Sequence, residues 1–198
     1  TTSFFPSKPL GCYGDGGAVF TDDEDIAYKL RSVRAHGKGA AKYDIERIGI
    51  NGRLDTLQAA ILGAKLPHFQ DEISKREEIA TWYDSALPNS VTTPARRPGA
   101  KSAWAWYTIK FQGTDRDAVA GHLKTAGIPS AVYYPRPMHL QTAYLPYGKG
   151  VGSLPVSEGL CDVVLSLPIH PFLSKEDVLF IAGELSGCVA NLTKTGTG

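Results

Sequence analysis

The stretch Ser3-Phe4-Phe5-Pro6-Ser7-Lys8-Pro9-Leu10-Gly11, followed by Gly14-Asp15-Gly16-Gly17, lies at the start of the chain. A lysine amine becomes a nucleophile where burial or a cationic neighbour disfavours its charge. Here two aromatic residues lead into Lys8, and the prolines on both sides of it restrict the backbone. The glycines that follow let the backbone approach a ligand closely. The stretch therefore predicts a lysine held in one position to exchange covalent bonds with a carbonyl group.

The spacing between Ser3 and Lys8 predicts a bend. A straight strand would separate the two residues by roughly 17 Å, at about 3.3 Å for each residue. Pro6 cannot donate to a strand ladder and is expected to mark a strand end, so the chain can curl and bring the two side chains together. A surface lysine in a proline-rich turn is the simpler alternative, but the aromatic lead-in and the glycines favour a functional lysine.

A second motif, Gly49-Ile50-Asn51-Gly52-Arg53, precedes a predicted helix. The Asn51 amide can donate hydrogen bonds, and the Arg53 guanidinium suits a phosphate or a carboxylate. The free N–H groups and the dipole of a helix N-terminus favour an anion at the same place. An ordinary Asn-Gly turn is the alternative interpretation of this segment.

Composition restricts the class of protein. The chain has 198 residues, of which 42% are hydrophobic and 21% charged, as in ordinary soluble globular proteins. A formal net charge of +1 gives no reason to expect a nucleic acid or an acidic membrane surface as partner. The three cysteines are widely spaced and argue against a disulfide framework and a metal site. Since neither a membrane-spanning run nor a basic signal region is present, the expected compartment is the cytoplasm.

Strand and helix patterns alternate along the chain and predict an α/β architecture. Short strands are expected at 1–5 and 17–20, and helices at 22–33, 54–66, 69–87, 115–126 and 175–190. Further strands are expected at 107–111, 131–134 and 163–167, with a long loop over 135–152. We divide the chain into a large-domain remnant with a connecting helix (1–74), a small C-terminal α/β domain (75–190) and a flexible tail (191–198).

The segments around Lys8 and Asn51 closely resemble the lysine and G-x-N-x-R signatures of the DegT/DnrJ/StrS family, which are pyridoxal-phosphate-dependent sugar-nucleotide aminotransferases. The resemblance implies that Lys8 forms the Schiff base with pyridoxal 5'-phosphate and that Ser3 binds the cofactor phosphate. It also implies that Asn51 reaches the cofactor phosphate of a partner subunit, and hence a homodimer. Asp55 does not correspond to the aspartate that pairs with the pyridinium nitrogen, which this family carries upstream.

A third motif, Tyr133-Tyr134-Pro135-Arg136-Pro137-Met138-His139-Leu140-Gln141, resembles the substrate loop of the same family, often H-Y-P-x-P-L-H. Tyr133 stands where a histidine is frequent, which puts any role of that histidine in question. The Tyr134 hydroxyl could contact the sugar or the carboxylate of the amino donor. His139 matches the family pattern, and a structural histidine is the alternative. Arg53, Tyr133, Tyr134 and His139 are therefore the candidate substrate-binding residues.

Members of this family have the fold of type I pyridoxal-phosphate transferases and are much longer than this chain. The resemblance therefore implies that residues 1–185 are the C-terminal half of such an enzyme, and that the isolated polypeptide retains little cofactor. The reaction implied moves an amino group from an amino acid, glutamate by analogy, to a keto sugar linked to a nucleotide. The lysine stretch especially resembles members that act on 3-keto sugars for surface polysaccharide. The alternatives are a pyridoxamine-dependent sugar dehydratase, in which histidine characteristically replaces the lysine, and a non-catalytic remnant of the fold.

Overall fold

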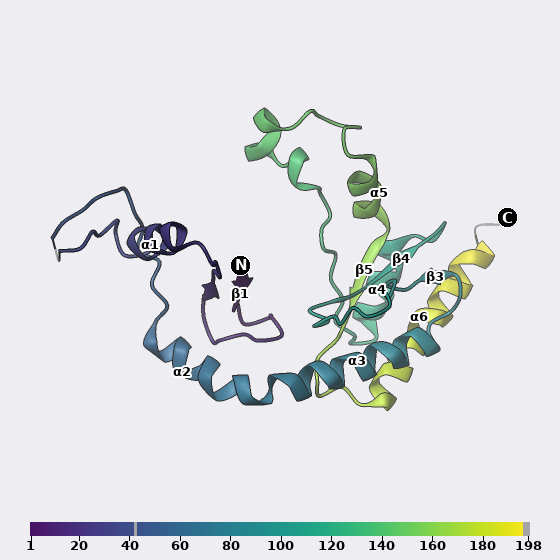
Figure 1. Ribbon diagram of the computed structural model, residues 1–198. Helices are drawn as coiled ribbons and strands as arrows, with labels where there is room; N and C mark the ends of the chain where they lie inside the picture. The colour runs from purple at the N-terminus through teal and green to yellow at the C-terminus, as the bar shows by residue number, and fades with distance from the viewer. Residues whose placement is uncertain (42, 196–198) are drawn as a thin grey trace. The chain divides into compact units, whose positions relative to one another are not determined.

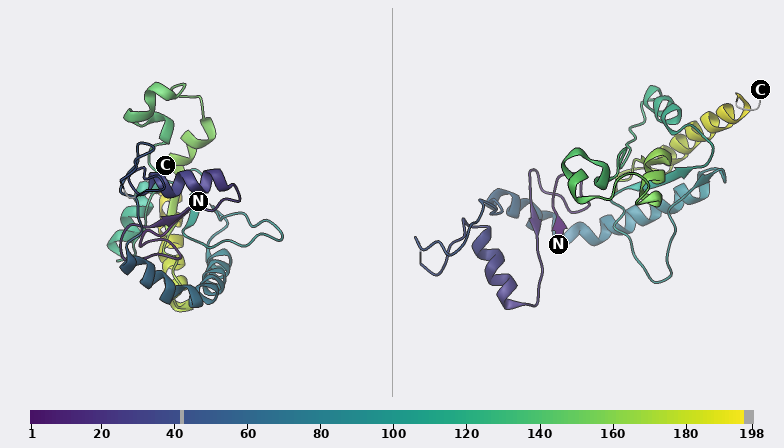
Figure 2. Two further views of the ribbon diagram at one scale, coloured as in Figure 1. Left: turned by 60° about the vertical axis from the view of Figure 1, so that its left-hand side comes forward. Right: turned by 90° about the horizontal axis from the view of Figure 1, so that it is seen from above.

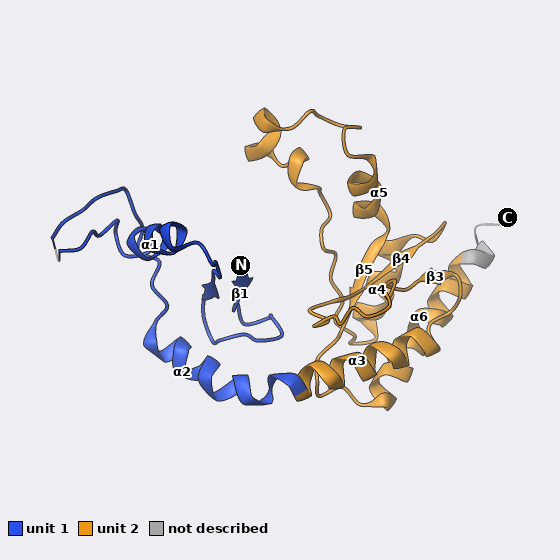
Figure 3. Ribbon diagram, viewed as in Figure 1, with its two compact units in different colours: residues 1–70 blue, residues 71–198 orange. Residues whose placement is uncertain are grey.

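A computed structural model describes residues 1–41 and 43–195 of the chain, and it divides into two compact units. Unit 1 comprises Thr1–Gln70 and unit 2 comprises Asp71–Gly198. Figure 3 colours the two units separately. Within the described residues, no helix combines the length with the apolar composition that crossing a membrane requires.

Unit 1 contains a short hairpin and two helices (Figure 1). Strands β1 (Thr2–Ser3) and β2 (Gly17–Ala18) pair antiparallel. Helix α1 (Glu24–Val33) begins after Asp23, whose carboxylate accepts a hydrogen bond from the Ile26 N–H, an N-cap of the usual kind. Helix α2 (Thr56–Lys65) follows a helix-free segment and continues into the 3₁₀ turn η1 (Leu66–His68).

Unit 2 is a three-stranded antiparallel sheet with helices. The strands β3 (Val91–Thr92), β4 (Tyr107–Phe111) and β5 (Val164–Leu167) lie in the order β3-β4-β5. Helix α3 (Phe69–Ala86) leads into this unit, α4 (Arg116–Thr125) follows β4, and α6 (Lys175–Thr195) follows β5. The 3₁₀ turns η2 (Met138–Leu140) and η3 (Thr142–Tyr147) and helix α5 (Pro155–Val163) lie between α4 and β5. In the views of Figures 1 and 2, this segment leaves the sheet of unit 2 and returns to it through α5.

The hydrophobic core of unit 2 lies between one face of the sheet and the helices α3, α4 and α6. Alternate residues of β4 are fully buried, which is the period-two pattern of a strand with one face in the core. The largest fully buried side chains are Tyr83, Tyr107 and Phe111, and the rings of Tyr83 and Tyr107 stack with 4.8 Å between their centroids. The opposite face of β4 carries Thr108, whose hydroxyl hydrogen bonds to that of Ser166 on β5.

Most of the predicted elements are present, and the exceptions have physical causes. The strand predicted at 131–134 is wrong: only Ala131 pairs with the sheet, through an isolated bridge to Ser166, because the tyrosines that follow pack on a tryptophan and Pro135 comes next. Helix α5 was not predicted, since it lies between the predicted loop over 135–152 and the strand predicted at 163–167 and shares only Val163 with them. Its proline stands at the first helical position, where a missing N–H costs nothing.

The C-terminal end is more regular than the predicted tail over 191–198. Helix α6 continues through Thr195, and Leu192 packs against the core, which extends the helix beyond Asn191. Residues 196–198 of the predicted tail lie outside the described part of the chain. The predicted domain boundary near residue 75 falls inside α3, the helix that contains the division between the two units.

Candidate active site

The loop between β1 and β2 carries Lys8 and folds back on itself. The Lys8 N–H donates to the Phe5 carbonyl at 2.8 Å, which closes a turn over Pro6 and Ser7. Two further backbone bonds of 2.8 Å close the base of the loop: the Phe4 N–H donates to Gly16 O, and the Cys12 N–H donates to Phe4 O. The bend that the proline predicted is therefore present, and the Lys8 residue is partly buried within it.

Close packing of backbone against backbone shapes this loop. A Cβ atom placed on Gly11 would lie 2.7 Å from Pro6 O and 2.8 Å from Phe5 O, distances that Cβ atoms do not adopt. The buried Cys12 thiol donates to Phe4 O at 3.0 Å and to Gly14 O at 3.1 Å. Glycine at position 11 thus lets the chain after Lys8 touch the chain before it.

We expect Gly11→Ala to destabilise unit 1 and displace the Lys8 turn, because the new methyl group meets carbonyl oxygens that cannot move independently. Overpacking of this kind typically costs about 1–3 kcal/mol. Gly121→Ala is the matched control, since Gly121 lies inside α4 with open space around its Cα and should gain roughly 0.5–1 kcal/mol. Urea denaturation of both variants measures the difference. Equal midpoints for Gly11→Ala and the wild type would show that the contact is not tight.

Ser3 lies at the end of β1, at the entrance to the same loop. Its Oγ accepts a hydrogen bond from the Phe5 N–H at 3.2 Å, and the residue is exposed, so the hydroxyl proton can be donated to a ligand oxygen. One closed loop thus offers an amine that can condense with an aldehyde and a hydroxyl that can bind a phosphate. These residues fit the chemistry of pyridoxal phosphate.

Asn51 and Arg53 lie on an exposed segment that leads into α2. The segment bonds to the C-terminal end of α1: the Ile50 N–H donates to Val33 O at 2.8 Å, and the Gly52 N–H donates to Arg34 O at 2.8 Å. The Arg53 Nε donates to the Asn51 Oδ1 at 3.3 Å. Both side chains are exposed and precede the first turn of α2, as the motif predicted.

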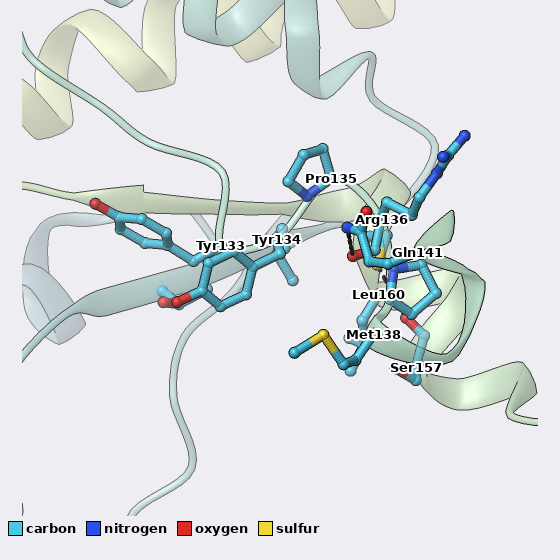
Figure 4. Close-up of a pocket in the computed structure, with 12 residues that line it drawn as sticks. Tyr133, Tyr134, Pro135, Arg136, Met138, Gln141, Ser157 and Leu160 are labelled. Atoms are coloured by element: carbon cyan, nitrogen blue, oxygen red, sulfur yellow. Dashed lines mark hydrogen bonds between the residues drawn. The ribbon is translucent and has the colours of Figure 1, made fainter. Parts of the chain in front are cut away.

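Tyr133 and Tyr134 lie in unit 2 beside a pocket of about 700 Å³. The Tyr133 ring stacks on Trp106 with 4.2 Å between centroids, and the Tyr134 ring meets the edge of both. Figure 4 shows the two tyrosines toward one side of the pocket and Arg136 and Gln141 toward the other. An aromatic wall that faces a few polar groups is typical of a small-molecule site.

His139 is held by a carboxylate. Its Nε2 lies 3.0 Å from the Glu158 Oε1, and the two side chains are only 10% and 18% exposed. Glu158 also accepts hydrogen bonds from the backbone N–H groups of Gly152 and Leu154, at 2.8–3.1 Å. The pair therefore connects η2, which contains His139, to α5, which contains Glu158. This contact gives His139 a structural role, while its contact with a substrate stays a prediction.

The hydrogen bonds that the Glu158 carboxylate accepts should depend on pH. The hydrogen bonds from the Gly152 and Leu154 N–H groups, with a smaller contribution from His139, lower the pKa of Glu158 below its ordinary value. A lowered pKa means that the stabilisation is present at neutral pH and is lost as the pH falls through the folded-state pKa. We expect the amide NMR shifts of Gly152 and Leu154 to titrate with a midpoint below that of an ordinary glutamate. In Glu158→Gln this titration should vanish, and a midpoint at or above the ordinary value would contradict the assignment.

The predicted site residues fall into three groups. Ser3 and Lys8 share one loop of unit 1, and Asn51 and Arg53 share a separate segment of the same unit. Tyr133, Tyr134 and His139 share one segment of unit 2. Sequence reasoning missed Glu158, for which the available signal was an acidic residue in the first turn of a helix that starts with proline.

Comparison with known proteins identifies the family of the chain. Residues 1–186 match the model of the DegT/DnrJ/EryC1/StrS aminotransferase family. The UDP-2-acetamido-2-deoxy-3-oxo-D-glucuronate aminotransferase of Pseudomonas aeruginosa is 43% identical over 186 residues, which cover 93% of this chain and 50% of that protein. The dTDP-3-amino-3,4,6-trideoxy-alpha-D-glucose transaminase of Streptomyces venezuelae is 39% identical over 179 residues, which cover 89% of this chain and 46% of that protein.

Among solved structures, a DegT DnrJ EryC1 StrS aminotransferase from Brucella abortus superposes with a TM-score of 0.88 at 51% identity, over 94% of this chain and 50% of that one. The chain thus spans about half the length of the relatives it matches, and its helices and strands form part of the fold of these transferases. The chain belongs to the DegT/DnrJ/EryC1/StrS aminotransferase family.

Proposed function

We propose that the whole protein is a pyridoxal-phosphate-dependent aminotransferase that moves an amino group from an amino acid, glutamate by analogy, to a keto sugar linked to a nucleotide. The observation that supports the proposal best is the closed loop that carries both Lys8 and Ser3. Membership of a family of sugar aminotransferases supports it. The amino acid becomes a 2-oxo acid, and the sugar carbonyl becomes a carbon bearing hydrogen and an amino group.

Each predicted site residue has a role in this proposal. The cofactor supplies an aldehyde that condenses with amines and an electron-withdrawing ring. Lys8 holds it covalently, and its freed Nζ then takes a proton from the Cα of the amino donor and returns it as a general acid. Ser3 binds the cofactor phosphate, and Asn51 binds that of a partner subunit in a homodimer.

The substrate side of the site is proposed from the remaining residues. The Arg53 guanidinium suits a substrate carboxylate or phosphate, and it lies beside Asn51. Tyr133 and Tyr134 provide aromatic surface and hydroxyl groups for the sugar nucleotide. His139 completes this segment, with the Glu158 pair holding its ring.

We propose a 3-keto sugar as the acceptor, for surface polysaccharide. The relatives from P. aeruginosa and S. venezuelae support the carbon position, since one name states a 3-oxo sugar and the other a 3-amino sugar. The cytoplasm, where nucleotide-linked sugars are made, is the proposed compartment. A nucleic acid or a membrane is not among the proposed partners.

The direct experiment incubates the whole protein with glutamate and a nucleotide-linked 3-keto sugar and identifies the products by mass. Equal amounts of 2-oxoglutarate and amino sugar are expected. A sugar that has lost a hydroxyl group without gaining nitrogen would instead favour a dehydratase, the alternative that Lys8 argues against. No product from a protein that binds the cofactor would favour a non-catalytic role.

A second arm of this experiment uses the 198-residue polypeptide alone. We propose that it retains little cofactor and little activity, because it spans only about half the length of its relatives and the resemblance places other cofactor contacts elsewhere. Absorbance of cofactor bound to lysine should be weak in this polypeptide and strong in the whole protein. A strong band from the 198 residues alone would overturn this part of the proposal.

A further inference from the structure

Two side chains of helix α2 form hydrogen bonds with the backbone of the Lys8 loop. The Lys65 Nζ donates a hydrogen bond of 2.6 Å to the Gly11 carbonyl oxygen. The Gln58 Oε1 accepts a hydrogen bond of 2.8 Å from the Tyr13 N–H. The helix therefore holds the loop at two points just after Lys8, all within unit 1.

The two tethers lie on one face of the helix. Gln58 and Lys65 are two turns apart, about 10 Å along the axis at 1.5 Å per residue, and both are partly buried. The residues between them on this face are the partly buried Ile61 and the buried Leu62. Leu57, on another face, is 70% exposed, so the polar pair faces inward although apolar residues are available.

Lys65 bonds to the loop at Gly11, a residue that is connected to the backbone of Lys8 by close contacts. Gly11 packs directly on the carbonyl groups of Phe5 and Pro6, and the Phe5 carbonyl accepts the hydrogen bond from the Lys8 N–H. A displacement of Gly11 therefore shifts the Phe5 carbonyl and, through its hydrogen bond, the backbone of Lys8. Because a charged donor makes a stronger hydrogen bond than a neutral one, the Lys65 ammonium is suited to fix this point.

A loop of this composition needs such support. It contains several glycines, which lose the most backbone freedom on ordering. An amine that must transfer a proton has to stay within a fraction of an ångström of its path, and a displacement of 1 Å can cost about 100-fold in rate. Contacts on a rigid helix provide more accurate positions than contacts within a loop.

We propose that Lys65 and Gln58 are positioning residues for the Lys8 loop: they set the place of the Lys8 amine without touching the cofactor or the substrate. This proposal rests on the proposed function, because it concerns the reaction for which Lys8 is used. Helix α2 would then support two parts of the site: the Lys8 loop through these side chains, and the Asn51–Arg53 segment, which leads directly into the helix.

The experiment uses the whole protein with its cofactor, five single variants and the double variant Lys65→Met/Gln58→Leu. Lys65→Met and Gln58→Leu remove one tether each while keeping similar side-chain volume. Lys65→Arg keeps a charged donor, and Gln58→Glu keeps an acceptor. Lys29→Met, an exposed lysine of α1, is the control for the loss of a lysine in general.

We expect Lys65→Met and Gln58→Leu to lower kcat by roughly 10- to 100-fold with little change in KM for the amino donor. The conservative variants Lys65→Arg and Gln58→Glu should recover most of the lost rate, and Lys29→Met should behave as the wild type. Because both tethers act on one loop, the double variant should lose less than the product of the two single losses. A role in folding alone would change the amount of folded protein and leave its kcat intact.

The outcomes separate this proposal from the one on which it depends. An active wild type with unchanged kcat in Lys65→Met and Gln58→Leu overturns the positioning role and leaves the proposed function in place. A wild type that makes no amino sugar overturns the proposed function and this proposal with it. Where Lys65→Met does not fold, the comparison of Gln58→Leu with Gln58→Glu decides: an equal kcat in the two overturns the positioning role.

Discussion

Lys8→Ala in the whole protein should abolish the absorbance of cofactor linked to lysine and lower the rate of amino transfer by roughly 10³-fold or more. The size of this fall in rate follows from two functions of the Lys8 Nζ, both of which the variant lacks. The variant lacks the amine that forms the covalent link, and it lacks the group that carries a proton to and from the donor Cα, a contribution of typically 10²- to 10⁴-fold by itself. The measurement is a spectrum of the purified protein followed by a transamination assay.

Two comparisons make the Lys8 result specific. Lys29→Ala, at an exposed position of α1, should keep both the spectrum and the rate. The free cofactor should still bind to Lys8→Ala non-covalently, because the Ser3 hydroxyl, the proposed ligand of the cofactor phosphate, is unchanged. A variant that keeps a lysine-linked spectrum would mean that another lysine holds the cofactor, and the assignment of the loop would be wrong.

Tyr107→Ala should produce the largest loss of stability among the variants discussed, about 3–5 kcal/mol. Tyr107 is the first residue of β4 and is fully buried. Its ring stacks on Tyr83, and its centroid lies 5.7 Å from that of the Trp104 ring. Its hydroxyl donates to the Asp84 carboxylate, and burial, followed by this hydrogen bond, raises the pKa of Tyr107, which keeps the hydroxyl neutral. The substitution leaves a cavity and removes the hydrogen bond together.

Two control variants separate these contributions in urea denaturation followed by tryptophan fluorescence. Tyr107→Phe keeps the ring and should lose only about 1 kcal/mol, while Asp84 retains its ion pair with Arg96. Tyr147→Ala, at a residue that is 85% exposed, should change the free energy of unfolding by less than about 0.5 kcal/mol. Similar unfolding midpoints for Tyr107→Ala and Tyr147→Ala would contradict the central place of Tyr107 in the core.

The sequence predicted those parts of the fold in which local signals agree with packing. The alternation of Tyr107, Ile109 and Phe111 predicted β4, and the structure buries these three side chains. Ser174 and Asp177 predicted the start of α6, where each bonds to the backbone N–H of the other. Here the same residues determine both the local conformation and the tertiary contact, so the pattern is sufficient.

The predictions failed where a distant contact determines the conformation. The pattern over 131–134 is that of a strand, but stacking of Tyr133 on Trp106 takes the chain out of the sheet after one residue. For α2, the apolar stripe was expected to include Leu57 and Ala64, whereas both are exposed and Gln58 and Lys65 face inward. These polar residues bond to a backbone some fifty residues earlier in the chain, a partner that periodicity cannot show.

The site was predictable to the extent that its motifs are contiguous. The bend at Lys8 followed from its prolines and glycines, and the position of Asn51 before a helix followed from the helix pattern. The contact between Glu158 and His139 could not be predicted from the sequence. The two residues are separated by a turn-rich segment, and the path of this segment depends on the hydrogen bonds of Gly152 and Leu154 to Glu158. The roles of these residues toward substrate stay predictions.

The most direct measurement reduces the whole protein with borohydride in the presence of pyridoxal phosphate and maps the modified peptide by mass spectrometry. Borohydride makes the link between the cofactor and its lysine permanent, so the position of the added mass identifies the amine without an assay of the sugar substrate. The expected result is a single modification at Lys8, within the peptide that contains the closed loop. Modification at another lysine, or none in a protein that is folded and saturated with cofactor, would contradict the account.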